Sequence, residues 1–449
     1  MTTFMHPPNG NGIRRSWRGR IMLLLLLASV VGPPAAAAQE QLTLRETIDA
    51  AIAANLDLKA AREGTAAARS IRAAERTRFF PSLSASYQYR RNDEATRTEG
   101  VGITAPEDEY SFVGTVSQPL FTGFSNLNRY RIAQLGLDAA RIETQIARQE
   151  VILDAKTVFF TILKAKKLKA VAEQAVRQLT AHRDVARHFH EAGMTPLNEV
   201  LKAEVELANA RQELVSADND LEIARSRLNL LLRRPLDTTF TLDETIQIVS
   251  FDRSLDFCIR TAEENRLELK IARLDVEIAE KEIRLGKTDY FPSVDLEGNY
   301  YQRGDDWDLD GGPGISNPHR WDVTAVASWT FWEWGRTGHT VREKRSRMAQ
   351  ARYNQEEISD QVQLEVKSAY LRTKESEKNI ITAKQAVAQA RESFRISTER
   401  YKEQVATSTD VLDAQTLLTR TMSSYYRALY DFMISKASLF RAMGLEIIG

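Results

Sequence analysis

The chain has 449 residues, of which 43% are hydrophobic and 27% charged, and its 61 basic residues balance its 61 acidic residues. This neutrality argues against a nucleic-acid-binding protein, for which a basic surface is the usual sign. The single cysteine, Cys258, excludes an intrachain disulfide and a cysteine-based metal site.

The N-terminal segment has the pattern of a secretory signal peptide. Four arginines precede an apolar run over residues 21–31, and a proline pair and a run of alanines follow. A permanent helical anchor needs about 20 apolar residues, so this run is too short for one. We therefore expect residues 1–38 to be removed on export.

The rest of the sequence contains one pattern twice. Phe-Pro-Ser at 80–82 returns at 291–293, and 291 minus 80 is 211. A period this long indicates two half-molecules rather than a solenoid of short repeats. We predict a first structural repeat over 39–240 and a second over 241–449.

Each repeat is predicted to open with a helix and continue into a β-hairpin. An Ala-rich helix over 42–78 ends before Pro81. The hairpins follow at 81–121 and 292–332. Their strands alternate apolar and polar side chains, as Leu83, Ala85, Tyr87 and Tyr89 illustrate.

Such alternation suits either a membrane strand or a soluble sheet. Segments of about 10 residues match a tilted strand that crosses a bilayer. Five of the six tryptophans lie between Trp307 and Trp334, as in an interfacial aromatic girdle, which favours the membrane. Four strands cannot close a barrel, because single-chain barrels begin at about 8 strands. Three copies would supply twelve strands and two copies eight.

After each hairpin we predict a very long helix, at 125–192 and 337–402. Ile132, Ala139 and Ile146 begin a seven-residue repeat, which indicates coiled-coil packing. A helix of this size is roughly 100 Å long at 1.5 Å per residue. Gly193 ends the first long helix, and return helices are predicted at 196–232 and 408–443.

No motif in the sequence indicates catalysis or cofactor binding. There is no phosphate-cradling glycine loop. His182, His188 and His190 lack the spacing of a helical metal site and are interpreted as solvated or packing residues. We expect neither an enzyme nor a cofactor or metal.

These features together resemble the TolC-like outer membrane efflux proteins over residues 40–445. The resemblance rests on the order and duplication of short motifs: Phe-Pro-Ser at 80–82 and 291–293, Phe-Thr-Gly-Phe at 121–124, Trp-Glu-Trp-Gly at 332–335, Ala-Gly-Met-Thr at 192–195 and Asp-Val-Leu-Asp-Ala-Gln at 410–415.

The resemblance implies a mainly α protein with internally duplicated coiled-coil helices and four transmembrane β-strands per protomer. Three copies would form a 12-stranded barrel in the outer membrane and a 12-helix periplasmic tunnel. The expected partners are outer-membrane lipid, a periplasmic adaptor and an inner-membrane pump, without nucleic acid. The implied function is passive export of small molecules such as drugs. Alternatives are the exit duct of a type I protein secretion system and a periplasmic coiled-coil scaffold without a pore.

The resemblance also implies a periplasmic gate formed by Asp410, Asp413 and Tyr401. The two aspartates are three residues apart and share a helix face, although Asp410 could instead offset the helix dipole and Asp413 be solvated. The implied adaptor-docking tips are Gly193, Met194 and Thr195 in the first turn and Gln404 and Val405 in the second.

The second tip departs from the family pattern at two positions. Gln404 stands where a glycine is frequent, and Ala406 replaces a basic residue able to pair with the gate aspartates. The arginines that could supply the missing charge are Arg391, Arg395 and Arg400.

Overall fold

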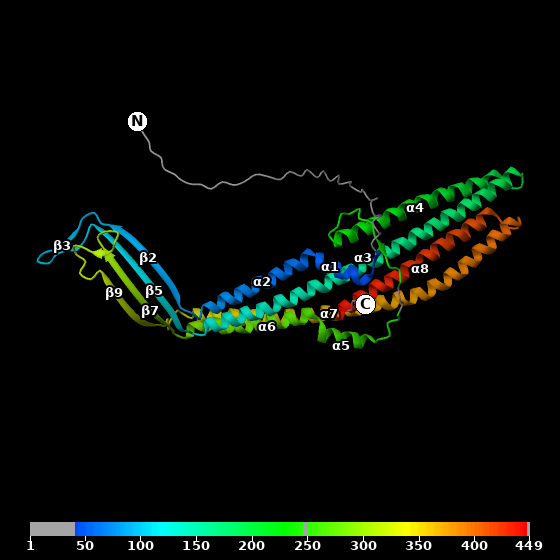
Figure 1. Ribbon diagram of the computed structural model, residues 1–449. Coiled ribbons are helices and arrows are strands. Elements are labelled where there is room, and N and C mark those ends of the chain that lie inside the picture. Colours follow the sequence, from blue (N-terminus) through cyan, green and yellow to red (C-terminus); the bar gives the residue numbers. More distant parts are fainter. Residues whose placement is uncertain (1–40, 246–248, 447–449) are drawn as a thin grey trace, which may run out of the picture. The chain divides into compact units, whose positions relative to one another are not determined.

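The structure is a computed structural model that describes residues 41–245 and 249–446. They belong to one compact unit, Gln41–Gly449, which is mainly helical with one larger antiparallel sheet (Figure 1). The predicted signal peptide, 1–38, lies outside the described residues.

The two repeats follow one another, and the bounds of their long helices and return helices correspond. The long helices are α3 (Ser125–Glu191) and α7 (Arg336–Lys402), and the return helices are α4 (Leu197–Leu231) and α8 (Ser408–Ala442). Because 336 minus 125 and 408 minus 197 are both 211, the duplication seen in the sequence extends to the starts of these helices.

The helix predicted over 42–78 is in fact two helices, α1 (Leu44–Ala54) and α2 (Leu56–Thr77). Asn55 takes an extended ψ of 131°, and its side chain accepts a hydrogen bond from the Leu58 backbone N–H at 2.8 Å. An asparagine that bonds its own backbone favours a cap over a helix interior, which explains the break. α1 is joined to the middle of the fold by a short parallel pair, β1 (Gln41–Leu42) with β6 (Thr241–Leu242).

The second repeat has the same break between α5 (Leu255–Asn265) and α6 (Leu267–Gly286), 211 residues later. Here Arg266 occupies the break, and its side chain is 5% exposed. Its guanidinium pairs with Glu268 at 2.7 Å and with Glu365 of α7 at 2.5 Å. The position that only interrupts a helix in the first repeat therefore also binds α7 in the second repeat.

The larger sheet combines the hairpins of both repeats. Its main strands are β2 (Ser82–Arg91), β5 (Asp108–Thr122), β7 (Ser293–Gly304) and β9 (His319–Ser328), antiparallel in that order. The short β8 (Asp310–Gly311) pairs with the end of β7, while β3 (Thr96–Thr98) and β4 (Gly102–Ala105) form a small hairpin in the β2–β5 connection.

The register places most of the apolar residues of the four main strands on one face. Leu83 is opposite Val116, Val116 is opposite Gly298, and Gly298 is opposite Val323. A bulge between Pro119 and Phe121 then brings Phe121 opposite Val294, on the same face. The opposite face carries polar residues such as Thr115, Asn299 and Asp322, whose side chains are linked by hydrogen bonds.

The strands enter the long helices through two successive residues in the left-handed backbone region. These are Gly123 and Phe124 in the first repeat, and Trp334 and Gly335 in the second, so the order of glycine and aromatic is reversed. A Cβ at Gly123 would lie 2.7 Å from the carbonyl oxygen of Thr288. Glycine is therefore required in the first repeat, whereas Trp334 at the equivalent position is 87% exposed.

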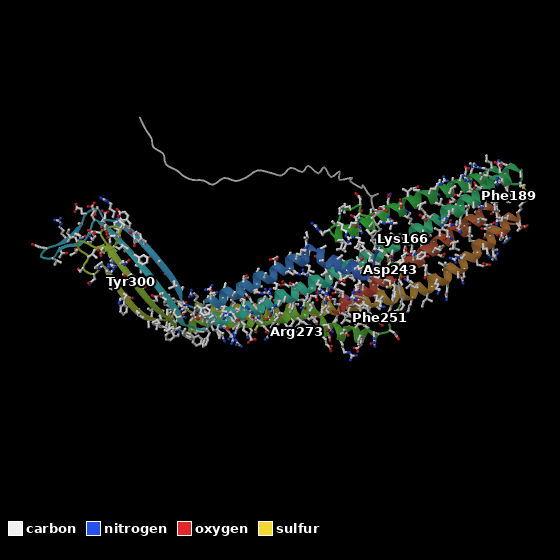
Figure 2. All side chains as sticks on the ribbon, in the orientation of Figure 1. Lys166, Phe189, Asp243, Phe251, Arg273 and Tyr300 are labelled. Carbon is white, nitrogen blue, oxygen red and sulfur yellow. The ribbon has the colours of Figure 1, made fainter. Side chains whose placement is uncertain are left out.

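The helices pack through seams whose buried residues are spaced alternately three and four apart, as in coiled coils. In α3 this seam consists of Ala172, Ala175, Leu179, His182 and Ala186. The turns α3–α4 and α7–α8 lie at the end of the unit away from the sheet, where Figure 2 labels Phe189. Within the two described stretches of chain, no helix has the length and apolarity needed to cross a bilayer.

Candidate functional site

The two helical turns have the same backbone hydrogen bonds. In the first, the Gly193 N–H donates to His190 O and the Met194 N–H donates to Phe189 O. In the second, the Gln404 N–H donates to Tyr401 O and the Val405 N–H donates to Arg400 O. Gly193 has a φ of 72° and Gln404 a φ of 61°. Gln404 therefore adopts the left-handed conformation that normally favours glycine.

The residues expected at the adaptor-docking tips lie together at this end. Met194 and Val405 are exposed, and the Gln404 side-chain amide is 3.5 Å from the Met194 sulfur. The Thr195 carbonyl accepts a hydrogen bond from His190 Nδ1 at 2.9 Å, which closes the first turn on itself.

Asp410 takes part in the cap at the start of α8, whose N-cap residue is Thr407. Its carboxylate accepts hydrogen bonds from the Thr407 backbone N–H and from the Thr407 hydroxyl, each at 2.8 Å. The Asp410 N–H in turn donates to the Thr407 hydroxyl, which completes a capping box. These bonds, led by the one from the backbone of Thr407, lower the pKa of Asp410, and the Arg400 charge contributes. Asp410 is therefore an anion over the physiological range.

Asp413 lies one turn further along α8, on the same exposed side as Asp410. Across residues 41–245 and 249–446 its carboxylate makes no hydrogen bond or ion pair. Of the three arginines considered as a replacement for the missing basic residue, Arg400 is the one whose charge acts on Asp410. Arg395 instead pairs with Glu392 at 2.7 Å.

Tyr401 is buried, whereas the two aspartates are exposed. Its side chain is 3% exposed and is directed into the interior, where its ring centroid is 4.9 Å from that of His182 and 5.6 Å from that of Phe189. Its hydroxyl donates to the Glu199 carboxylate of α4 at 3.5 Å. Burial, followed by the Glu199 charge, raises the pKa of Tyr401 to about 12, so the hydroxyl stays protonated. Tyr401 thus connects α7 with α3 and α4.

His182 and Ser408 join α3 to the start of α8. Both are buried, and His182 Nε2 is 2.7 Å from the Ser408 hydroxyl. Burial lowers the pKa of His182 to about 4, which keeps the imidazole neutral near neutral pH. This bond crosses the interior between the two repeats. The tip thereby combines an exposed acidic face on α8 with a polar cluster that consists of the buried residues His182, Tyr401 and Ser408 and the half-buried Glu199.

The sequence prediction did not assign His182 and Ser408 to the gate region. The seam spacing could have placed His182 inside, because it continues the three-and-four pattern of Ala175 and Leu179. Ser408 likewise belongs to a three-and-four pattern, which continues through Val411, Gln415 and Leu418 in α8.

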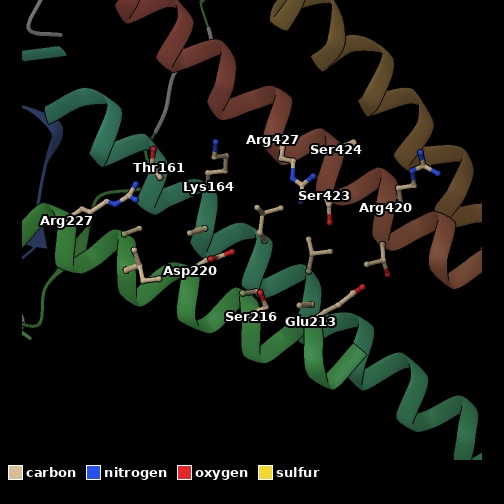
Figure 3. A pocket seen from close by; sticks show the side chains of 18 residues that line it. Thr161, Lys164, Glu213, Ser216, Asp220, Arg227, Arg420, Ser423, Ser424 and Arg427 are labelled. Atoms are coloured by element: carbon tan, nitrogen blue, oxygen red, sulfur yellow. The ribbon is translucent and has the colours of Figure 1, made fainter. Parts of the chain in front are cut away.

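Further from the tip, α4 and α8 separate around a cavity of about 870 Å³ (Figure 3). α3 forms its floor, and the walls carry both signs of charge, including Glu213 and Asp220 from α4 and Arg420 and Arg427 from α8. Among the residues that the structure describes, no group of three or more histidine, cysteine or acidic side chains is arranged to hold a metal ion.

Comparison with known proteins identifies the family of this duplicated arrangement. The family described as outer membrane efflux protein matches residues 47–232 and 258–445, one segment in each repeat. These segments cover most of the chain and include both tips.

Individual relatives and a solved structure agree with this match. Outer membrane protein TolC of Escherichia coli is 22% identical over 379 residues, covering 82% of this chain and 75% of TolC. The alkaline protease secretion protein AprF of Pseudomonas aeruginosa is 24% identical over 389 residues, covering 83% and 78%. The crystal structure of the outer membrane protein VceC from Vibrio cholerae superposes with a TM-score of 0.79 at 17% identity, covering 89% of this chain and 96% of VceC.

The matched family and fold are those of channel proteins rather than enzymes. The chain belongs to the outer membrane efflux protein family and is located in the outer membrane, as the sequence motifs predicted.

Proposed function

We propose that three copies of this chain form a passive exit channel, with the sheets in the outer membrane and the helices enclosing a periplasmic tunnel. The single observation that carries this proposal is the four-stranded sheet with one apolar face and two open edges. In the described part of the chain, β2 pairs only with β5, and β9 pairs only with β7.

An open strand edge is not tolerated in hydrocarbon, because its N–H and C=O groups would lack hydrogen-bond partners. Pairing β2 of one copy with β9 of the next satisfies both edges. The apolar face, on which Leu83, Trp321 and Val323 are strongly exposed, would then face lipid. We propose three copies rather than two because the family resemblance implies a trimer.

The helices also support assembly with further copies. α4 exposes several large apolar side chains along its length: Leu197, Leu201, Val205, Val215, Ile223 and Leu230. Contiguous exposed apolar surface generally marks an interaction site. Neighbouring copies would cover part of this surface, and a periplasmic adaptor would contact the tips around Gly193 and Gln404.

Asp410 and Asp413 are proposed to constrict the tunnel entrance. Three copies would bring six carboxylates close to one axis, where they attract cations and repel anions. Tyr401 would act differently from the aspartates, by holding α7 against α3 and α4 in the closed state. Opening would require the α7–α8 pair to move away from this contact.

The transported material is proposed to be small molecules supplied by an adaptor and an inner-membrane pump. The name of AprF, a secretion protein for alkaline protease, supports the second candidate, the exit duct of a type I protein secretion system. Coexpression with an adaptor and pump of each class, followed by assays of drug resistance and of protein release, separates the two candidates.

The assembly is tested by outer-membrane fractionation and by conductance in planar bilayers. We expect a detergent-dependent, heat-labile trimer that forms pores without an energy source. A stable monomer that stays in solution without detergent would refute the proposal and favour the scaffold alternative.

The gate is tested by block of the conductance with multivalent cations. Asp410→Ala combined with Asp413→Ala should weaken the block at least tenfold, because it removes six charges per trimer. Glu403→Ala is the matched control, since Glu403 is an exposed acid of the same turn outside α8. Unchanged block in the double variant, or equal loss in the control, would reject the assignment.

A further inference from the structure

A cavity of about 330 Å³ lies where the sheet meets the helices, at the junction between the two repeats inside one chain. One wall comes from the end of β5 and the start of α3, and the other from the end of α6 and the segment before β7. Two phenylalanines, Phe124 and Phe291, and three basic residues, Arg131, Arg284 and Lys287, line it. We refer to the two phenylalanines as the aromatic side of the cavity and to the three basic residues as its cationic side.

The cationic side carries positive charge that the protein does not neutralise. Arg284 pairs with Glu280 at 2.7 Å. In the stretches of chain that the structure describes, the side chains of Arg131 and Lys287 make neither an ion pair nor a hydrogen bond. The nearby acid Asp289 is directed to Arg336, at 3.8 Å. Two exposed cations are thus available to an anionic ligand.

The aromatic side continues into the apolar face of the sheet. Phe121 lies on that face, opposite Val294. Its ring is 5.2 Å from the ring of Phe124, which is 5.5 Å from the ring of Phe291, both pairs being edge-to-face. Phe124 and Phe291 are each about half exposed. An apolar path therefore leads from the sheet directly to the cations.

We propose that this cavity binds the phosphate headgroup of an anionic phospholipid. The phosphate would contact Arg131 and Lys287, and the acyl chains would extend past Phe124 along the apolar face at Phe121. The inference rests on the proposed function, because a sheet in the outer membrane places this junction at the periplasmic surface of the bilayer. Aromatic rings at the interface and basic residues beside them are the arrangement that recognises anionic lipid headgroups.

Phosphate chemistry alone would also fit a free anion, so the experiment has to separate lipid from soluble phosphate. The full-length assembled protein is purified in a neutral detergent and titrated with phosphatidylglycerol, phosphatidylcholine, glycerophosphoglycerol or inorganic phosphate. Native mass spectrometry counts the bound molecules. We expect phosphatidylglycerol to bind with a stoichiometry of one per chain and at least tenfold more tightly than the other three.

The double variant Arg131→Gln with Lys287→Gln should weaken phosphatidylglycerol binding roughly ten- to thirtyfold, as expected for the loss of two interfacial cations. The control is Arg129→Gln with Lys281→Gln, which removes the same charge from the same two helices without touching the cavity. This control should bind like the parent protein.

Three results would overturn the inference: equal binding of phosphatidylcholine, equal binding of glycerophosphoglycerol or inorganic phosphate, or equal loss in both double variants. Outer-membrane fractionation and pore conductance of the same preparations keep the proposed function separate. A protein that forms pores but shows no lipid preference contradicts only the lipid site. A protein that forms no pores contradicts the exit channel.

Discussion

The two tips share a backbone but differ in the side chains that stabilise it. Gly193 and Gln404 are 211 residues apart and close their turns with equivalent hydrogen bonds. After the first turn, Pro196 precedes α4 without a side-chain cap, whereas Thr407 and Asp410 form a capping box at the start of α8. The two turns thus share a conformation, while the following helix has a side-chain cap at the second turn only.

The difference is larger inside the bundle. His190, the counterpart of Tyr401 in the first repeat, bonds the carbonyl of its own turn at Thr195. Tyr401 instead inserts between α3 and α4. The first tip thus has a bond that closes its own turn, while Tyr401 of the second tip is held by contacts with α3 and α4 of the first repeat. We therefore expect opening of the second tip to depend on those contacts.

The largest effect is expected when the two counterparts, Tyr401 and His190, are each truncated to alanine. Tyr401→Ala removes a buried aromatic ring and should lower the free energy of opening of the second tip by about 3–5 kcal/mol. His190→Ala should cost about 1 kcal/mol, because it removes one hydrogen bond at a half-buried site. Hydrogen exchange with mass spectrometry measures each tip separately. Equal effects at the two tips would contradict the comparison.

The buried bond between His182 and Ser408 should make opening of the second tip sensitive to pH. The folded pKa of His182 is about 4, below its ordinary value of 6.5, so an opened tip binds a proton more readily than the closed tip. Protection from exchange is fully present above pH 6.5 and should fall as the pH is lowered toward 4. The groups facing the ring are Ser408 and Tyr401, which remain neutral in this range, with Glu199 behind Tyr401.

Two variants isolate the contribution of the imidazole. His182→Leu should abolish its part of the pH dependence and leave the part that comes from other groups in place. His182→Ala should lower the opening free energy by about 1–3 kcal/mol at neutral pH, because the buried Ser408 hydroxyl loses its partner. An unchanged pH profile in His182→Leu would assign the sensitivity to the carboxylates instead.

The smallest expected effect concerns the left-handed residues themselves. Gln404→Gly should stabilise the second turn by about 1 kcal/mol, since a non-glycine residue costs roughly 1–2 kcal/mol in this conformation. Gly193→Gln should destabilise the first turn by a similar amount, since a Cβ at Gly193 meets no neighbouring atom and only backbone strain is added. Exchange rates of the turn amides give both values. A stabilised first turn in Gly193→Gln would contradict the assignment of strain to the left-handed backbone.

Much of the fold was predictable because its determinants are local and repeated. Pro81 and Pro292 precede strands, Gly193 ends a helix, and the seven-residue repeat through Ile132 and Ala139 specifies a long coiled-coil helix. The break at Asn55 was missed because the apolar spacing continues across it. Its cause is one side-chain hydrogen bond to Leu58, which composition and periodicity do not reveal.

The candidate site was predictable only in part. Asp410 and Asp413 share an exposed side of α8, as their spacing of three residues requires. Sequence reasoning could not show that Tyr401 is buried, because the residues that cover it include His182 and Phe189 of α3 and Glu199 of α4, which are remote in sequence. The sequence also left open whether Asp410 acts at the start of its own helix, and only its contacts with Thr407 show the cap there.

The reversed order of glycine and aromatic at the strand-to-helix junctions makes the two halves of the chain non-interchangeable. Gly123 has no room for a side chain because Thr288 of the other half lies against it, whereas Trp334 extends outward. Exchanging the two junction sequences would therefore place a tryptophan side chain against Thr288, where a Cβ alone already lies 2.7 Å from the carbonyl oxygen. The first junction holds the two halves of the chain in close contact, and the second leaves its aromatic side chain at the surface.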